Sequence, residues 1–262
     1  MMKKAILGTA LVCGILAWPV MAMAADAGKT EAAAKAPVTD ALKYRMEDWD
    51  PALIKFFEEG PRILPSEFTV EIPPYPANTS EETQAELATL RAYEKEARTP
   101  ETLEKIRYEN TVVPLYQVFS HYGLYDFEKA PITNSLLASV DRDLSVFLLG
   151  VKKEMQRPRP TQLDPVLTTV VAVQSHAAYP SGHAAQAYAS ALVLGMVDPA
   201  QAEQYKQIAL DVAHRREVAG VHFPSDSAAG RMLAEQVVKA LFEKPAIRKR
   251  LELARKEFAT SR

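Results

Sequence analysis

The segment of residues 134–157 constrains the fold of this chain more than any other part of the sequence. Its apolar residues recur at steps of three and four, the spacing that places side chains on one side of an α-helix. They are Leu137, Val140, Leu144, Phe147, Leu148 and Val151. Arg157-Pro158 ends the pattern, because proline cannot continue a helix. The segment is therefore predicted to be a long amphipathic helix that opens at Asn134 and carries Lys152 in its last turns.

Further helices are indicated by N-terminal signals, which are a side chain that caps free backbone amides or a proline in the first turn. Thr79 and Glu82 have capping-box spacing and predict a helix that runs to about Ala97. A second helix is predicted to run from about Ser227 to Leu241. Three further helices are predicted to start at Thr99-Pro100, Asp198-Pro199 and Pro245. Helical signals therefore dominate the chain after the proline-rich segment.

No stretch shows the convincing alternation of a half-buried strand. The best candidate is "VLTTVVAVQ", residues 166–174, which is equally compatible with a buried helix. Glycine is scarce, at 10 of 262 residues, and no internal repeat is visible. The sequence therefore predicts an all-α fold, a single-domain helical bundle.

The N-terminus has the pattern of a secretory signal peptide, predicted for residues 1–24. The basic start Met1 to Lys4 precedes an apolar run from Ala5 to about Val20 and a small-x-small cleavage site at Ala22-Met23-Ala24. This run is too short for a membrane anchor, and no later run reaches the roughly 18 to 20 apolar residues that a spanning helix needs. We expect cleavage after Ala24, a periplasmic location and no integral membrane association.

Cys13 is the only cysteine of the chain and lies inside that segment. Its removal excludes a disulfide, a thiolate metal site and a cysteine nucleophile. Lipid attachment at Cys13 is an alternative, but Val12 stands where such a site needs a small residue. Loss of Lys3 and Lys4 leaves 29 basic against 33 acidic residues. This negative balance argues against binding to nucleic acid.

The rest of the N-terminal region divides into a leader and an arm. Residues 25–45 are predicted to be a flexible leader, because their first part is rich in Ala, with Lys, Thr and Asp, and has no periodicity. The prolines between Asp48 and Pro76, including those of "EIPPYPANTS", suggest an extended arm that lies on the domain. Residues 46–262 are predicted to form one domain.

Two clusters place polar and charged residues at helix ends. In "KKEMQRPRP", Lys152 and Arg159-Pro160 are separated by six residues, so two cations stand where a helix ends, although a solvated basic C-terminus would look the same. The second cluster is Pro180-Ser181-Gly182-His183, which directly precedes a helical stretch. Free amides, a glycine and a hydroxyl make an anion cradle that His183 can face. The alternative is an ordinary helix cap by Ser181.

The third cluster is "RREVAGVHFPSDSAAG", in which Arg216, His222 and Asp226 follow one another with five and three residues between them. Arg216 continues the apolar stripe of Ile208 and Val212, so it is predicted to point inward, where a guanidinium needs an anion. Asp226 either caps the following helix or accepts a hydrogen bond from His222. The second arrangement would fix the tautomer of the ring and leave the other nitrogen free to attack.

In order and spacing, the three clusters resemble the signature of the type 2 phosphatidic acid phosphatase (PAP2) superfamily: Lys-x6-Arg-Pro, Pro-Ser-Gly-His and Ser-Arg-x5-His-x3-Asp. Among soluble members the chain resembles the bacterial class A non-specific acid phosphatases in export signal, size and the "ILP" and "PPYPANTS" segments. One departure is Arg215, which stands in the place of the signature serine. The resemblance implies a helical bundle of the acid phosphatase/vanadium haloperoxidase type and hydrolysis of phosphomonoesters through a phosphohistidine.

The resemblance also implies which residues bind the phosphate. Lys152, Arg159 and Arg216 would neutralise its charge, while Ser181 and the amide of Gly182 would donate to its oxygens. Small-molecule phosphate esters are the implied substrates. No metal ion and no cofactor are implied.

For catalysis, the resemblance implies His222 as the nucleophile, oriented by Asp226. His183 would protonate the leaving alkoxide and then activate the water that hydrolyses the phosphohistidine. The remaining histidines, His121, His176 and His214, are expected to have structural or surface roles, with His176 near the second cluster.

Three alternative functions fit parts of the pattern. A vanadium-dependent haloperoxidase could hold vanadate in the same signature, but this chain is short for that family. A lipid phosphate or polyprenyl diphosphate phosphatase would normally carry membrane helices. A non-enzymatic phosphate-binding protein would need the cradle but has no reason to keep His183, His222 and Asp226 together. The sequence leaves open the preferred substrate and whether the chain forms a homo-oligomer.

Overall fold

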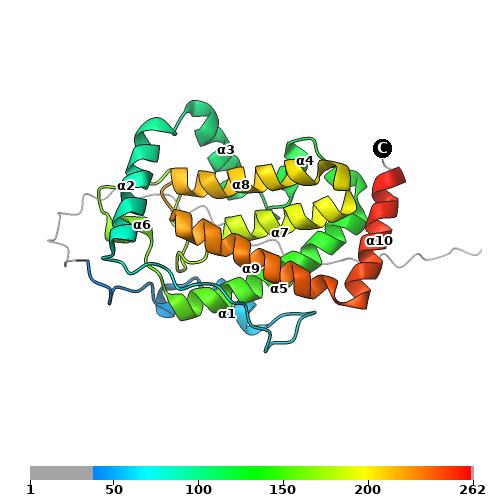
Figure 1. Ribbon diagram of the computed structural model, residues 1–262, viewed down its shortest axis with the longest axis horizontal. Coiled ribbons are helices and arrows are strands. Elements are labelled where there is room, and N and C mark those ends of the chain that lie inside the picture. Colours follow the sequence, from blue (N-terminus) through cyan, green and yellow to red (C-terminus); the bar gives the residue numbers. More distant parts are fainter. Residues whose placement is uncertain (1–37, 261–262) are drawn as a thin grey trace, which may run out of the picture.

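A computed structural model describes residues 38–260 of the chain, and these residues form an α-helical bundle without β-strands (Figure 1). The longer helices are α2 (Glu81–Glu96), α3 (Pro100–Thr111), α5 (Pro131–Met155), α7 (Gly182–Val197), α8 (Ala202–Val218), α9 (Pro224–Phe242) and α10 (Pro245–Thr260). The short helices are α1 (Pro51–Glu58), α4 (Gln117–His121) and α6 (Pro160–Leu163). The predicted all-α fold is confirmed. The predicted signal peptide lies outside the described residues.

Helix α7 is central to the bundle because its sequence is apolar on all sides. Its buried residues are Ala184, Ala185, Ala187, Ala189, Ser190, Ala191, Val193, Leu194 and Val197. A helix of this kind is stable only when other elements surround it, and α7 packs against α5, α8 and α9 (Figure 1). The small side chains allow close approach, since a Cβ on Gly195 would lie 3.1 Å from the Cβ of Ala202.

Helix α5 has the predicted amphipathic pattern. Its buried apolar residues include Leu137, Val140, Leu144, Phe147 and Leu148, each of which contributes about 1.5–3 kcal/mol when fully buried. The helix begins at Pro131 rather than at Asn134, because proline suits the first turn and the Asn134 side chain instead donates to the carbonyl of Phe127. It ends at Met155, two residues before the predicted end at Arg157-Pro158, with Gln156 in the left-handed conformation.

Two other helix starts differ from the prediction. The cap of α2 is Ser80, because the hydroxyl of Thr79 is bonded to Asp40 instead. Helix α9 begins at Pro224, three residues before Ser227, since proline occupies the first turn. The predicted starts of α3 and α10 are confirmed.

Two segments between the longer helices also differ from the secondary structure predicted for them. Residues 166–174 form neither a strand nor a buried helix but a loop along the end of the bundle. Asp198-Pro199 opens a single 3₁₀ turn, Pro199–Gln201, and α8 follows from Ala202.

The N-terminal arm is less extended than predicted, since it contains a 3₁₀ turn (Met46–Asp48) and α1 before the proline-rich stretch. The arm is anchored by the buried carboxylate of Asp143, which accepts from the amides of Arg62, Ile63 and Leu64 at 2.7–3.0 Å. The predicted flexible leader, residues 25–45, is too long at its C-terminal end. Residues 39–42 are tied to the domain by the side chain of Asn78, which donates to two of their carbonyls.

The ends of four helices meet at one end of the bundle, on the left in Figure 1. They are the C-terminal ends of α5 and α8 and the N-terminal ends of α7 and α9. This arrangement brings together three segments that are far apart in the sequence and that contain the three clusters of charged and polar residues. Within residues 38–260, no helix combines the length and apolar character that crossing a bilayer requires.

Candidate active site

Three cations from three different segments lie buried at this end of the bundle. Lys152, Arg159 and Arg216 are each 0% exposed. Lys152 donates from Nζ to the carbonyls of Ala177 and Ala178, at 2.7 and 3.0 Å. Among the described residues, none of the three cations forms an ion pair with a carboxylate.

The other two cations also contact neutral groups. Arg159 donates to the carbonyls of His176 and Val221 and lies 3.0 Å from Nε2 of His222. Both Nη atoms of Arg216 are 3.3 Å from Oδ1 of Asn110, and its Nε has no partner within the described part of the chain. Because a buried guanidinium without an anion is costly, Arg216 is poised to accept one.

Burial lowers the pKa values of all three cations, and the charge of Arg159 also lowers those of Lys152 and Arg216. Burial lowers the pKa of Arg216 to about 9 and that of Arg159 to about 10. Burial, followed by the charge of Arg159, lowers the pKa of Lys152 well below its ordinary value. A bound dianion would relieve this repulsion, so the cluster has the electrostatics of an anion site.

The N-terminus of α7 supplies hydrogen-bond donors beside these cations. Ser181 caps the helix, with its Oγ accepting weakly from the amide of Ala184 at 3.4 Å, so the hydroxyl proton is free to donate elsewhere. The amides of Gly182 and His183 find no acceptor among residues 38–260. Free amides at a helix start favour an anion.

A glycine that sequence reasoning did not single out allows this helix end to approach α9. A Cβ on Gly230 would lie 2.6 Å from the carbonyl oxygen of Ser181 and 3.2 Å from the Cβ of Ala184. Such a contact is too short, so only glycine fits at this position. The amide of Ser181 in turn donates to the carbonyl of Asp226.

His222 and Asp226 have the predicted contact. Nδ1 of His222 lies 3.1 Å from Oδ2 of Asp226, and both side chains are buried. The same oxygen accepts from the amide of Phe223, so Asp226 both caps α9 and orients the ring. The two alternatives that the sequence left open for Asp226 are therefore realised together. Nε2 of His222 is left facing the cations.

Arg157 is a second residue that sequence reasoning missed, although it lies inside the first cluster. It is fully buried and donates to Oδ1 of Asp226 at 2.6 Å and to Glu86 at 2.9 Å. Its guanidinium also lies over the ring of Phe223, at 3.8 Å from the ring centre. Arg157 therefore holds Asp226 in place, rather than facing the anion site.

His183 is held through a neutral group instead of a carboxylate. Its Nε2 lies 3.2 Å from the backbone carbonyl of Glu109, at the end of α3. Nδ1 is then the ring nitrogen available on the other side. Burial lowers the pKa values of both His183 and His222 well below the ordinary value, and the charges of Arg159, Arg216 and Lys152 lower them further. Burial and the nearby cations thus favour the neutral form of both rings in the absence of an anion.

The remaining histidines differ in their places. His176 lies beside the site, because its carbonyl and Nδ1 both contact Arg159. His214 is half-exposed and lies 3.5 Å from Glu217. His121 is stacked on Tyr108.

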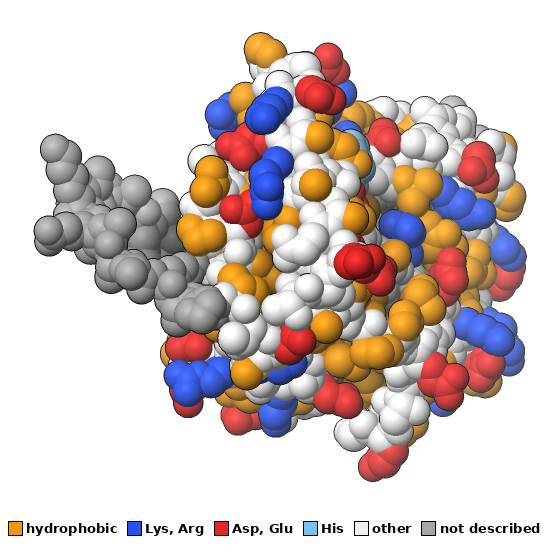
Figure 2. Space-filling view, turned by 60° about the vertical axis from the view of Figure 1, so that its left-hand side comes forward, with side chains coloured by type: hydrophobic (Ala, Val, Ile, Leu, Met, Phe, Trp, Pro, Cys, Tyr) orange, Lys and Arg blue, Asp and Glu red, His pale blue; other side chains and the backbone are white. Residues whose placement is uncertain are grey.

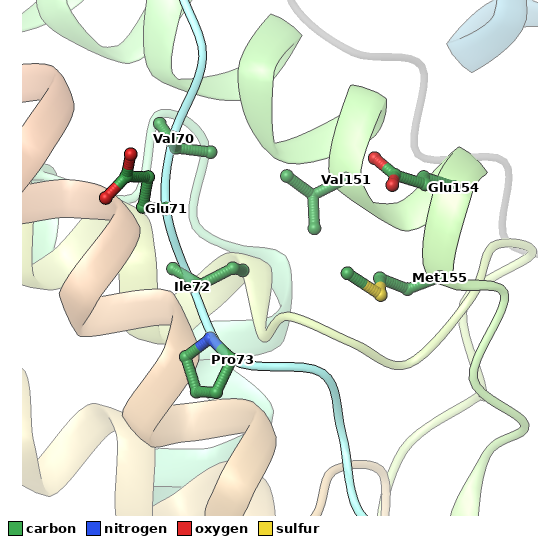
Figure 3. A pocket seen from close by; sticks show the side chains of 7 residues that line it. All are labelled: Val70, Glu71, Ile72, Pro73, Val151, Glu154 and Met155. Atoms are coloured by element: carbon green, nitrogen blue, oxygen red, sulfur yellow. The ribbon is translucent and has the colours of Figure 1, made fainter.

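The surface features lie apart from this cluster. On the face shown in Figure 2, Lys and Arg side chains are interspersed with Asp and Glu, without a broad patch of one sign. A cavity of about 450 Å³ opens between the arm and the end of α5 (Figure 3). It is lined by Val70, Glu71, Ile72, Pro73, Val151, Glu154 and Met155. The cations of the site are not among them.

Comparisons with known proteins show what the chain is similar to. The chain is 31% identical over 135 residues to a non-specific acid phosphatase of Providencia stuartii, covering 50% of this chain and 54% of that protein. It thus spans about half the length of this curated relative. The crystal structure of a bacterial vanadium-dependent iodoperoxidase has the same fold, with a TM-score of 0.53, 17% identity, and coverage of 68% of this chain and 52% of that chain.

A transmembrane phosphatidylglycerolphosphate phosphatase of the PAP2 type from Bacillus subtilis aligns with a TM-score of 0.45 and 22% identity, over 64% of this chain and 90% of that chain, which is too low for any conclusion. The family comparison is more specific. Residues 135–249, which contain all three clusters, match the PAP2 superfamily. The similarity to the PAP2 superfamily thus lies in the part of the chain that carries the candidate site.

Proposed function

We propose that this chain is an acid phosphatase that hydrolyses phosphomonoesters through a phosphohistidine on His222. The observation that carries the proposal is the set of three buried cations without a carboxylate partner among the described residues, opposite a histidine that is oriented by Asp226. Leaving charges buried and unpaired costs several kcal/mol, on the order of 3–5 for one partner of a broken buried pair. A phosphate dianion would offset that cost.

The resting contacts suggest how substrate binding starts the reaction. Nη1 of Arg159 lies 3.0 Å from Nε2 of His222 and occupies the lone pair that must attack phosphorus. A phosphate oxygen between Arg159, Lys152 and Arg216 would accept the hydrogen bond from Nη1 of Arg159 in place of His222. Substrate binding therefore frees the nucleophile at the moment when the phosphorus atom arrives in front of it.

Transfer then follows in two steps. Nε2 of His222 forms a bond to phosphorus while the bond to the ester oxygen breaks, and Nδ1 of His183 gives its proton to the departing alkoxide. In the second step, His183 takes a proton from water, the water oxygen bonds to phosphorus, and the bond to Nε2 breaks. Ser181, the amide of Gly182 and the three cations stabilise the charge on the transferred group, which supplies most of the catalysis.

The bound substrate also favours protonation of His183, the proposed general acid. Burial, followed by the charges of the cations, lowers the pKa of His183 in the empty site, but the charge of a phosphate dianion opposes this shift and favours the imidazolium. Nδ1 of His183 therefore carries the proton when substrate is present. For this reason we expect an optimum on the acidic side of neutrality.

The test is an activity panel with the purified protein. Phosphomonoesters, diphosphates and lipid phosphates are compared with and without chelator, and halide with peroxide and vanadate is assayed without it. We expect phosphomonoester hydrolysis that survives chelation and is inhibited by vanadate, which imitates the five-coordinate transition state. Hydrolysis of lipid phosphates alone, halide oxidation alone, or phosphate binding without turnover would each replace the proposal by the corresponding alternative.

We also propose that the protein is exported to the periplasm. The signal-peptide pattern of residues 1–24 supports this location. N-terminal sequencing of protein from the periplasmic fraction is expected to begin at Ala25. A chain that keeps Met1 and stays in the cytoplasm would contradict the proposal.

A further inference from the structure

Arg215, the residue that stands in the place of the signature serine, forms a buried ion pair across two helices. Its Nη2 and Nε lie 2.6 and 2.8 Å from Oε1 of Glu109, and Nε lies 3.0 Å from Oε2. The Glu109 side chain is 0% exposed and that of Arg215 is 11% exposed. A serine is too short to make this contact, so the substitution adds a link between α8 and α3.

The other end of Glu109 reaches the active site. Its backbone carbonyl is one of the last carbonyls of α3, which have no donor within the helix. Nε2 of His183 lies 3.2 Å from this oxygen. The contact defines the tautomer of the neutral ring, with the hydrogen on Nε2. It also places the ring at the negative end of the helix dipole, where an imidazolium is favoured.

The neighbouring residues repeat this pattern. Arg216 contacts the side chain of Asn110, just as Arg215 contacts that of Glu109. Two consecutive arginines of α8 therefore hold two consecutive residues in the last turn of α3. One of these arginines faces the anion site, whereas the other is turned away from it, toward Glu109 and the hydroxyl of Tyr122.

We propose that Arg215 is a positioning residue for His183: by fixing Glu109, it keeps the carbonyl of Glu109 on Nε2 and Nδ1 directed toward the leaving group. The inference rests on the proposed function, because it assigns a task to the proton donor of that reaction. It accounts for the presence of an arginine where the signature has a serine.

The groups that affect the protonation of His183 come from several helices and loops around it. Arg216 of α8, Arg159 before α6 and Lys152 of α5 oppose its protonation, while the Glu109 carbonyl favours it. His222 faces it from the loop before α9. Arg215 acts on the ring only through Glu109, so its removal should change the position of the ring more than the charge around it.

The test compares Arg215→Ala, Glu109→Ala and the double variant. Glu109→Ala keeps the backbone carbonyl but releases it from Arg215, and the double variant leaves no buried charge unpaired. Arg215→Lys is the conservative variant. Arg142→Ala is the matched control, because Arg142 is 10% exposed and pairs with Glu59 on the other side of the bundle. Single-turnover rates are measured for an alkyl phosphate and for an aryl phosphate with a good leaving group.

Because general acid catalysis is worth about 10²–10⁴-fold, partial misplacement of the acid should slow the alkyl ester by about tenfold or more and the aryl ester by less than about threefold. We expect this selective loss in Arg215→Ala, Glu109→Ala and the double variant, without additivity between them. Arg215→Lys should restore most of the alkyl rate, and Arg142→Ala should change neither rate. In a His183→Ala background, Arg215→Ala should have no further effect on the alkyl ester.

A second readout does not depend on activity. The chain has five histidines, so their ring nitrogens can be resolved by ¹⁵N NMR of histidine-labelled protein. We expect His183 to hold its hydrogen on Nε2 in the wild type and to show a mixture of tautomers in Arg215→Ala. Equal losses for both esters, additivity with His183→Ala, or an unchanged tautomer would overturn the inference. A wild-type protein without phosphatase activity would instead overturn the proposed function.

Discussion

The two histidines of the site are supported by different means. His222 is held at Nδ1 by the carboxylate of Asp226, which Arg157 neutralises from behind. His183 is held at Nε2 by a neutral carbonyl, whose residue is in turn held by Arg215. In each case an arginine holds an acidic residue and that residue holds a ring, but only His222 is in contact with the carboxylate itself.

This difference separates two roles for one kind of side chain. A carboxylate on Nδ1 makes Nε2 more electron-rich, which suits a nucleophile, and it stabilises the positive charge of a phosphohistidine. A carbonyl at a helix C-terminus fixes the ring without supplying a full charge, so the protonation of His183 depends on the substrate. In the proposed mechanism, the environment, rather than the residue type, assigns nucleophile and acid.

Replacing His222 should have the largest effect. His222→Ala removes the attacking nitrogen, so we expect activity on all phosphomonoesters to fall by at least about 10⁴-fold. An acid-labile phosphoenzyme, trapped by quenching with labelled substrate, should disappear. A phosphoenzyme that persists in this variant would assign the nucleophile to another residue and remove the basis of the comparison.

His183→Ala should produce a smaller and selective loss. We expect alkyl phosphates to react about 10³-fold more slowly, and aryl phosphates with good leaving groups to be affected by less than about tenfold, because only poor leaving groups need a proton. The dependence of the single-turnover rate on leaving-group pKa measures this difference. A slope identical to that of the wild type would show that the two histidines do not have separate roles.

Asp226→Asn should impair His222 and should slow alkyl and aryl phosphates equally. The variant keeps the shape of the side chain but loses the charge behind His222, and we expect a loss of about 10²-fold in phosphoenzyme formation for both ester classes. The ratio of alkyl to aryl rates should stay at its wild-type value. A change in that ratio would indicate that Asp226 supports His183 as well.

A separate effect is expected on stability at acidic pH. Burial lowers the folded-state pKa values of His176, His183 and His222, so below about pH 6.5 the unfolded state binds more protons than the folded state. Stability should therefore fall as pH falls below that value, by up to about 1.4 kcal/mol per pH unit for each histidine. Thermal denaturation between pH 7.5 and 5 measures this, and added phosphate should reduce the loss. A transition temperature independent of pH in this range would contradict it.

His214 should affect the pH dependence of stability in the opposite direction. Glu217 raises the pKa of His214, so its contribution is present below the unfolded-state value and is lost as pH rises through the folded-state value. His214→Gln should leave the loss caused by the three buried rings in place. If His214→Gln abolished the pH dependence, the burial of the site histidines would not be its cause.

The sequence predicted the parts of this molecule whose signals are local. The apolar spacing between residues 134 and 157 specifies α5, and Thr99-Pro100 and Pro245 mark helix starts, because capping and proline geometry act within one turn. Prediction failed where a distant partner competes. Thr79 does not cap α2 because Asp40 takes its hydroxyl, and residues 166–174 form a loop, although their composition suits a strand or a buried helix.

For the site, the sequence by itself determined which residues are candidates for the chemistry, since the spacing of Lys152, Arg159, His222 and Asp226 is a property of the chain. Only the tertiary structure decided which residues hold these side chains and the phosphate-binding segment in position. Arg157 on Asp226, Glu109 on His183 and Gly230 beneath Ser181 each join residues more than 45 positions apart. Contacts of this kind arise from helix packing and leave no periodicity or short motif, so no reading of the linear sequence could assign them.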